Sequence, residues 1–195
     1  MNRMRAFIAL KLPGLITTDI QAIQEKLAGY RFKVRWVKAD NIHLTLKFLG
    51  DVDVHIIEAV SACVAEAVNG IRPFQLAASG IGVFPNIKRA RVVWIGLSEQ
   101  VKALNELQKS IDINLAELGF PRERRQFKGH LTLGRSKGTI DAANLAEALE
   151  EFRTFKSKTF VVDRVTVFRS DLKSSGAVYT ELREIALASD QMHLW

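Results

Sequence analysis

Cysteine is almost absent from this sequence, and its scarcity excludes two classes of small domain. Cys63 is the single cysteine among 195 residues, so the chain holds neither an internal disulfide framework nor a cysteine-based zinc site. A reducing compartment is the simplest location for such a chain, and we expect a cytoplasmic protein.

Long apolar runs are missing as well. The run from Ala6 to Leu10 ends at Lys11 and is shorter than the ~7 to 15 residues of a signal-peptide core. No other stretch approaches the ~18 apolar residues of a transmembrane helix, so we expect no membrane association. Proline is scarce, with four residues, and no serine–glycine linker or low-complexity tract divides the chain. We therefore expect a single domain over residues 1–195 that consists of two intertwined lobes.

The composition that remains is typical of a folded domain with a positive excess. Hydrophobic residues make up 48% of the chain and charged residues 25%, which is average for a globular protein. Lys and Arg number 28 against 21 Asp and Glu, a formal net charge of +7. This excess favours polyanionic partners without identifying one.

The hydrophobic periodicity alternates between strand-like and helix-like segments and predicts an α+β fold built on antiparallel sheets. No strand is followed by a glycine-rich phosphate loop, which disfavours Rossmann and P-loop folds. The expected strands cover residues 4–11, 32–37, 42–49, 74–79, 91–97, 129–134, 160–168 and 178–187, and the expected helices lie around residues 20–27, 57–67, 104–118 and 145–152.

The tetrapeptide His-Leu-Thr-Leu occurs twice, beginning at His43 and at His130, each time in a strand-like segment. Side chains alternate between the two faces of a strand. His43 and Thr45 therefore share one face with Lys47, which could contact phosphate or solvent, and the leucines share the other face with Phe48. The second copy has the same alternation. If the two strands are neighbours around a pseudo-twofold axis, two imidazoles and two hydroxyls meet at one site.

Two histidines and two threonines suit metal-independent chemistry on a phosphodiester. One imidazole can accept a proton while the other donates one, because an unperturbed histidine pKa near ~6.5 makes both forms available at neutral pH. Threonine hydroxyls can donate hydrogen bonds to the non-bridging phosphate oxygens. The two histidines are far apart in the sequence and lack the close spacing of a zinc motif, so we expect no metal and no other cofactor. A single His-x-Thr is more often a solvated strand face, but its duplication favours a functional pair.

Blocks that surround the two motifs complete a family pattern. They are Arg5–Leu10, Trp36–Val37, Asn41–Gly50, Gly82–Pro85, Arg91–Trp94, Phe127–Arg135, and Phe168–Ser170 with Gly176 and Tyr179. With these blocks the sequence resembles the two-histidine phosphoesterase superfamily and, within it, the RNA 2′,3′-cyclic phosphodiesterases that are also described as 2′-5′ RNA ligases. The resemblance covers most of the chain.

This resemblance implies a bilobal, pseudo-twofold fold of two antiparallel sheets with outer helices around a central groove. In that fold His43 is the proton donor to the leaving ribose oxygen O3′, and His130 is the base that activates water. The implied product is a 2′-phosphomonoester. Thr45 and Thr132 are the hydroxyls that bind the phosphate.

Three further residues are expected at the substrate. The resemblance implies that Arg135 neutralises phosphate charge, although strict alternation turns it away from His130 unless the strand bends at Gly134. Phe7 and Trp36 could stack on an RNA base, and packing in the core is the alternative for both rings.

The expected partner is RNA that ends in a 2′,3′-cyclic phosphate, tRNA-like or other. We expect no obligate protein partner and a monomer. Two basic groups could follow the RNA backbone or be solvated surface. They are residues 122–128, and Lys88 with Arg89 and Arg91.

Two other functions remain open. The chain could bind RNA ends without turnover, in which case binding would depend strongly on salt and no product would form. It could also hydrolyse a small cyclic nucleotide or an ADP-ribose cyclic phosphate. A comparison of mononucleotide with oligonucleotide substrates separates these small substrates from RNA, because basic flanking segments matter only for the longer ligand.

Overall fold

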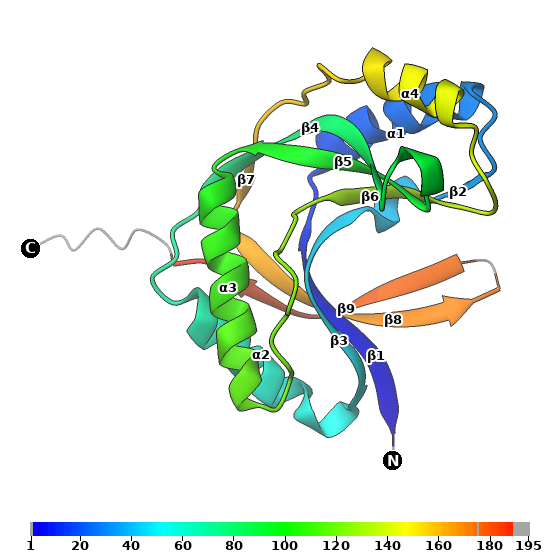
Figure 1. Ribbon diagram of the computed structural model, residues 1–195. Coiled ribbons are helices and arrows are strands. Elements are labelled where there is room, and N and C mark those ends of the chain that lie inside the picture. The colour runs from blue at the N-terminus through cyan, green and yellow to red at the C-terminus, as the bar shows by residue number, and fades with distance from the viewer. Residues whose placement is uncertain (1, 175, 189–195) are drawn as a thin grey trace, which may run out of the picture.

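The chain folds into an α+β structure in which antiparallel strands form one continuous, curved sheet (Figure 1). The structure is a computed structural model that describes residues 2–174 and 176–188. Within this part the sheet has nine strands: eight follow the order β7-β4-β5-β6-β3-β1-β8-β9, and the ninth, β2, pairs with β6. The strands are β1 (Arg3–Lys11), β2 (Val34–Trp36), β3 (His43–Asp53), β4 (Phe74–Phe84), β5 (Val92–Glu99), β6 (Leu131–Ser136), β7 (Phe160–Val162), β8 (Arg164–Lys173) and β9 (Gly176–Ala186). The helices are α1 (Gly14–Gly29), α2 (Ile57–Val68), α3 (Val101–Glu117) and α4 (Ala142–Glu151), with 3-10 turns η1 (Ala39–Asn41), η2 (Val54–Ile56) and η3 (Ile87–Arg89).

Two halves of the sheet meet at one residue pair. Strands β3, β1, β8 and β9 form one half, and β7, β4, β5 and β6 with β2 form the other. Leu44 on β3 pairs with Leu131 on β6, and this pair joins the two halves of the sheet. Helices α2 and α3 lie along the first half, and α1 and α4 lie over the second (Figure 1). The expected α+β class with antiparallel strands and outer helices is confirmed, and the two expected sheets are halves of one sheet because this pair links them.

The main core lies between the sheet and the helices. Alternation along β1 places Ile8 and Leu10 in this core, whereas Phe7 and Ala9 belong to a smaller cluster with Phe168 on the opposite face. Burial of each large aliphatic side chain stabilises the fold by about 1.5–3 kcal/mol, which fixes the face that each element presents to the core. In the described part of the chain, none of the helices has both the length and the apolarity needed to cross a bilayer. The helical residues that fill the core recur every three or four positions: Ile16, Ile20, Ile23 and Leu27 in α1, Val60 and Val64 in α2, and Leu104, Leu107, Ile111 and Leu115 in α3.

Strand boundaries differ from the expected ones near the second motif and in the last hairpin. Strand β6 begins at Leu131, so His130, expected inside a strand, immediately precedes it. The polar segment 170–176, expected as a connection, is mostly strand, because Lys173 at the end of β8 still pairs with Gly176 of β9. Cross-strand pairing thus overrides the turn-like composition of this segment.

The first motif strand contains a β-bulge where the motif ends. Thr45 and Lys47 pair with consecutive residues of β1, which leaves Leu46 without a partner. A bulge of one residue reverses the alternation of side chains beyond it. The prediction that Lys47 shares the face of His43 is therefore wrong: Lys47 is buried on the core side, and Phe48, expected with the leucines, is exposed.

The second motif strand contains a bulge at the equivalent place. Thr132 and Gly134 pair with consecutive residues of β5, and Leu133, the fourth residue of the motif, has no partner. Leu133 and Gly134 are both buried, and Arg135 beyond them is exposed. Arg135 was expected to face the site only if the strand bends at Gly134. The bulge supplies this change of direction and returns the Arg135 side chain to the face of Thr132.

Candidate active site

The two motifs meet at the leucine pair that joins the halves of the sheet. Continuing its antiparallel register by one residue in each direction sets His43 opposite Thr132 and Thr45 opposite His130. Both leucines are buried in the core, and neighbouring side chains along a strand alternate faces. The two histidines and two threonines therefore share the opposite face, and each is partly exposed there.

Both imidazoles are held in the same way by a backbone carbonyl two residues earlier. His43 Nδ1 lies 2.8 Å from the carbonyl oxygen of Asn41, and His130 Nδ1 lies 2.7 Å from that of Lys128. A carbonyl can only accept, so each Nδ1 carries the hydrogen and donates it. Each Nε2 therefore remains free to take up or release a proton at the site.

Aromatic rings enclose His43. Its ring centroid lies 4.7 Å from that of Phe7 and 5.1 Å from that of Tyr179, which meets it edge-on. Burial in these surroundings lowers the pKa of His43, because the charged imidazolium loses water, and the hydrogen bond to the Asn41 carbonyl opposes this in part. The Asn41 side chain also donates to the Ala177 carbonyl at 2.8 Å, which ties η1 to the β8–β9 hairpin.

His130 has different neighbours. Phe84 on β4 meets it edge-on at 5.0 Å, and Trp94 on β5 lies 6.3 Å away. Phe84 and Trp94 stack on each other at 5.0 Å. The two histidines thus belong to separate aromatic clusters, one in each half of the sheet.

Of the two rings expected to stack on a base, one reaches the site and the other does not. Phe7 contacts His43, but it is only 3% exposed, so it supports the imidazole and offers little surface to a ligand. Trp36 pairs with Gly134 and packs half-buried against the main core. The structure does not bring it to the face of the histidines.

The charge of Arg135, on β6 in one half of the sheet, acts on Tyr179, on β9 in the other half. Burial raises the pKa of the Tyr179 hydroxyl, and the positive charges of Arg135 and Arg5 act in the opposite direction. Both guanidinium groups are therefore close to Tyr179, which itself contacts His43. The sequence blocks contain Arg5 and Tyr179, but alternation alone gave no reason to assign them to this site.

Phe48 is a third residue, after Arg5 and Tyr179, that the sequence did not assign to the site. Its side chain is 59% exposed, and its ring lies 6.1 Å from that of Phe7 on the face of His43. Only the bulge at Leu46 turns it to this face, so strict alternation placed it in the core.

Lys47 contributes to the support of the second motif. It donates to the Asp112 carboxylate on α3 and, at 2.6 Å, to the Pro121 carbonyl. Asp112 also accepts from the Glu123 amide at 3.2 Å from each carboxylate oxygen. This buried network fixes the beginning of the basic segment that leads to His130.

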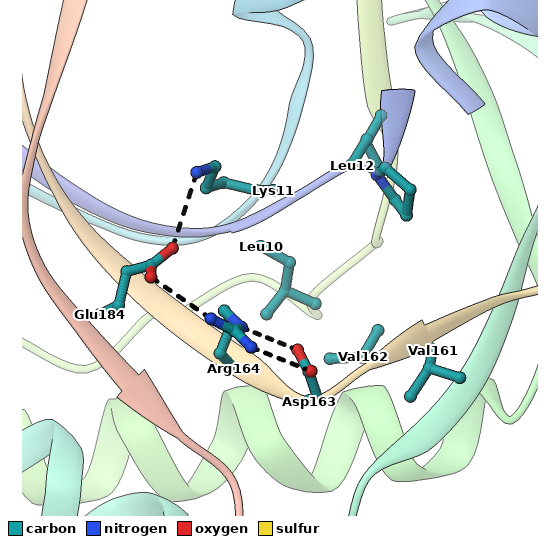
Figure 2. Close-up of a pocket in the computed structure, with 9 residues that line it drawn as sticks. Leu10, Lys11, Leu12, Val161, Val162, Asp163, Arg164 and Glu184 are labelled. Atoms are coloured by element: carbon teal, nitrogen blue, oxygen red, sulfur yellow. Dashed lines mark hydrogen bonds and ion pairs between the residues drawn. The ribbon is translucent and has the colours of Figure 1, made fainter. Parts of the chain in front are cut away.

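A cavity of about 280 Å³ lies at the end of β1, where Lys11 pairs with His43. Figure 2 shows that its cations are bridged by carboxylates. Lys11 Nζ lies 3.6 Å from Glu184, and Arg164 lies 3.4 Å from Glu184 and 3.0 Å from Asp163. Because these charges are balanced, the cavity is less suited to an anion than the face of the two histidines.

The described residues hold no group of three or more His, Cys, Asp or Glu side chains placed to share a metal ion. The absence of a metal from the reaction remains a prediction.

Fold and site together define a two-histidine phosphoesterase, in which two His-x-Thr pairs share one face around a pseudo-twofold axis. The chain belongs to the 2′-5′ RNA ligase superfamily, whose sequence model matches residues 12–173.

Individual relatives match over nearly their whole length. An RNA 2′,3′-cyclic phosphodiesterase of Methanothermobacter thermautotrophicus is 34% identical over 185 residues, which span 95% of this chain and 100% of the relative. A protein of the same name from Aquifex aeolicus is 32% identical over 189 residues, with 96% and 99% covered. The crystal structure of Escherichia coli LigT in the apo form matches with a TM-score of 0.74 at 27% identity, covering 97% of this chain and 100% of LigT.

Proposed function

We propose that this protein hydrolyses the 2′,3′-cyclic phosphate at the end of an RNA to a 2′-phosphomonoester by acid–base catalysis that needs no metal. The observation that carries the proposal is the register that sets each motif histidine opposite the threonine of the other motif, with both Nε2 atoms free. The name shared by the relatives, RNA 2′,3′-cyclic phosphodiesterase, supports the same reaction.

In this mechanism water attacks phosphorus from the side opposite to the leaving O3′. His130 takes a proton from the water through Nε2, and His43 gives a proton to O3′ as the P–O3′ bond breaks. Thr45, Thr132 and Arg135 bind the non-bridging oxygens, where negative charge increases. After turnover His43 is neutral and His130 is protonated, and proton exchange with solvent restores both.

The same groups permit 2′-5′ ligation. A 5′-hydroxyl then takes the place of water, His130 accepts its proton, and His43 again protonates O3′. The product is a 2′-5′ phosphodiester. Hydrolysis and ligation differ only in the nucleophile on the His130 side.

Both halves of the sheet contribute to the mechanism, and all its side chains come from one chain. His43 and Thr45 belong to the first half, and His130, Thr132 and Arg135 to the second. This supports a monomer without an obligate protein partner, with residues 1–195 acting as one domain of two intertwined lobes on an RNA end, tRNA-like or other.

The test of this function is hydrolysis of an oligonucleotide that ends in a 2′,3′-cyclic phosphate, in excess EDTA. We expect a 2′-phosphomonoester at a rate that added Mg²⁺ does not change. A cyclic mononucleotide measured in parallel shows how much the RNA chain contributes. Salt-sensitive binding without product would identify an RNA-end binding protein, and a preference for the mononucleotide would identify a phosphodiesterase for small cyclic nucleotides.

The burial of His43 predicts how one limb of the pH profile responds to mutation. Because His43 must be protonated to act as an acid, the active fraction of this side chain falls as the pH rises through its lowered pKa. Replacing Tyr179 with alanine lets water reach the imidazole and raises this pKa toward its ordinary value. We expect an NMR titration of the His43 Cε1–H to move to higher pH, and kcat/KM at alkaline pH to rise relative to kcat/KM at acidic pH.

Tyr179→Phe is the matched control for this shift, since it keeps the ring against His43 and removes only the hydroxyl. Its NMR titration and its pH profile should coincide with those of the wild type. The limbs of the pH profile belong to the two coupled histidines together. The NMR titration is therefore needed to assign a pKa shift to His43. If the NMR titration of His43 moves to higher pH and kcat/KM at alkaline pH does not rise relative to its value at acidic pH, His43 is not the acid.

A further inference from the structure

A cavity of about 700 Å³ lies in the half of the sheet that carries His130. Gly82 and Trp94 line its sheet side, and Ile87 and Leu149 form apolar walls. The volume lies within the range of ~300–1,000 Å³ that is typical of small-ligand sites. It is therefore large enough for a nucleoside.

The cavity is coupled to His130 through Trp94. Trp94 on β5 pairs with Thr132 on β6, so its side chain shares the face of the second motif. Its ring lies so close to Gly82 that a Cβ there would come within 2.2 Å of it. Glycine at this position lets the indole lie over β4, where it forms one side of the cavity and still approaches His130 at 6.3 Å.

Two positively charged side chains line this cavity. Lys88 and Arg89 on η3 line it and are exposed. The Asn86 side chain accepts from the Arg89 amide at 3.1 Å and fixes the turn that carries them. Among the described residues, no carboxylate forms an ion pair with either cation. Apolar walls with unpaired cations at one side match a nucleoside followed by a phosphate.

The direction of nucleophilic attack indicates which of the two RNA strands would place a nucleoside in this cavity. Under the proposed function, the strand that ends in the cyclic phosphate lies on the side of its leaving O3′, beside His43. The nucleophile enters from the opposite side, beside His130. Trp94 and the cavity belong to that second side, because the rings that surround His43 come from β1, β8 and β9.

We propose that this cavity binds the first nucleoside of an acceptor RNA, the strand whose 5′-hydroxyl attacks during 2′-5′ ligation. The inference rests on the proposed function. Lys88 and Arg89 bind the phosphate that follows this nucleoside. The 5′-oxygen of the acceptor nucleoside forms the new bond to phosphorus, and the proton of this 5′-hydroxyl passes to His130. The P–O3′ bond of the donor breaks, and His43 protonates O3′. Water needs no such site, so the cavity serves ligation and not hydrolysis.

The test compares ligation with hydrolysis in the double variant Lys88→Glu with Arg89→Glu. The donor is an oligonucleotide that ends in a 2′,3′-cyclic phosphate, and the acceptor is an oligonucleotide with a 5′-hydroxyl and a blocked 3′ end. At acceptor concentrations below saturation we expect the ratio of ligated to hydrolysed donor to fall by about tenfold or more. Hydrolysis of the donor without acceptor should stay within about twofold of the wild type, because both substituted side chains are exposed and outside the catalytic set.

The matched control carries the same change of charge on α3, as Lys102→Glu with Lys109→Glu, both exposed. It should leave the ratio unchanged. Equal losses of ligation and hydrolysis in the η3 variant would place the donor strand in the cavity and overturn the proposal. An unchanged ratio, or hydrolysis by the wild type with no detectable ligation, would overturn it as well. Absence of hydrolysis in the wild type would instead contradict the proposed function itself.

Discussion

Replacing His130 with alanine is expected to lower kcat/KM for a cyclic-phosphate oligonucleotide by about 10²- to 10⁴-fold, the usual contribution of a positioned general base. His43→Ala is expected to cause a loss of similar size, because it removes the proton for O3′. The backbone carbonyls that hold the two Nδ1 atoms leave the Nε2 of each ring for this exchange, and an alanine side chain offers no group for it. Steady-state hydrolysis in EDTA measures both losses.

The double variant and an exposed histidine provide the controls. The two imidazoles act in one proton-transfer step, so the double variant should lose little more activity than either single variant. His55→Ala alters an exposed histidine next to α2 and should be fully active. If either motif variant keeps its activity within about tenfold of the wild type, the acid–base pair is not His43 and His130.

Replacing Lys47 with methionine is expected to lower the free energy of unfolding by about 3–5 kcal/mol, the usual cost of breaking a buried ion pair from one side. Lys47 and Asp112 are 3% and 9% exposed in their side chains. Removal of the ammonium group leaves the Asp112 carboxylate buried with the Glu123 amide and the more distant Arg122 guanidinium at 3.8 Å. Urea denaturation of the whole chain measures the loss, which is large against a total stability of about 5–15 kcal/mol for a domain.

An exposed lysine on α3 provides the control that separates the effect of burial from the effect of losing a positive charge. Lys102 pairs with Glu106 in i,i+4 geometry at 3.9 Å, with 92% and 66% of the side chains exposed, and Lys102→Met should cost less than about 1 kcal/mol. Adding Asp112→Leu to Lys47→Met removes the unpaired carboxylate and should recover part of the stability. A loss below about 1 kcal/mol for Lys47→Met alone would mean that Lys47 is solvated, as a strand lysine on the face of His43 would be.

The location of each helix and strand was largely predictable, because local periodicity is set by burial. Residues recurring every three or four positions predicted a helix over 104–118, and α3 spans Val101–Glu117. The extent of the last hairpin was not predictable, since pairing between β8 and β9 continues through polar residues to Lys173 and Gly176. Composition describes a residue's own preference, whereas strand ends depend on a partner strand.

The doubled motif and the class of chemistry could be predicted from the sequence by itself. Two His-x-Thr pairs in alternating strands require no long-range information to place the imidazole and the hydroxyl of each pair on one face. The positive excess and the single cysteine could likewise be read without a structure.

The tertiary structure alone decided which other residues join those pairs. Bulges at Leu46 and Leu133 arise from pairing with β1 and β5, and each reverses the alternation that a single strand predicts. For this reason Phe48 and Arg135 lie with the histidines while Lys47 is buried against Asp112, 65 positions away in the sequence. A side-chain pattern with a period of two determines faces only until the first unpaired residue, and which residue is unpaired depends on strands that are distant in the sequence.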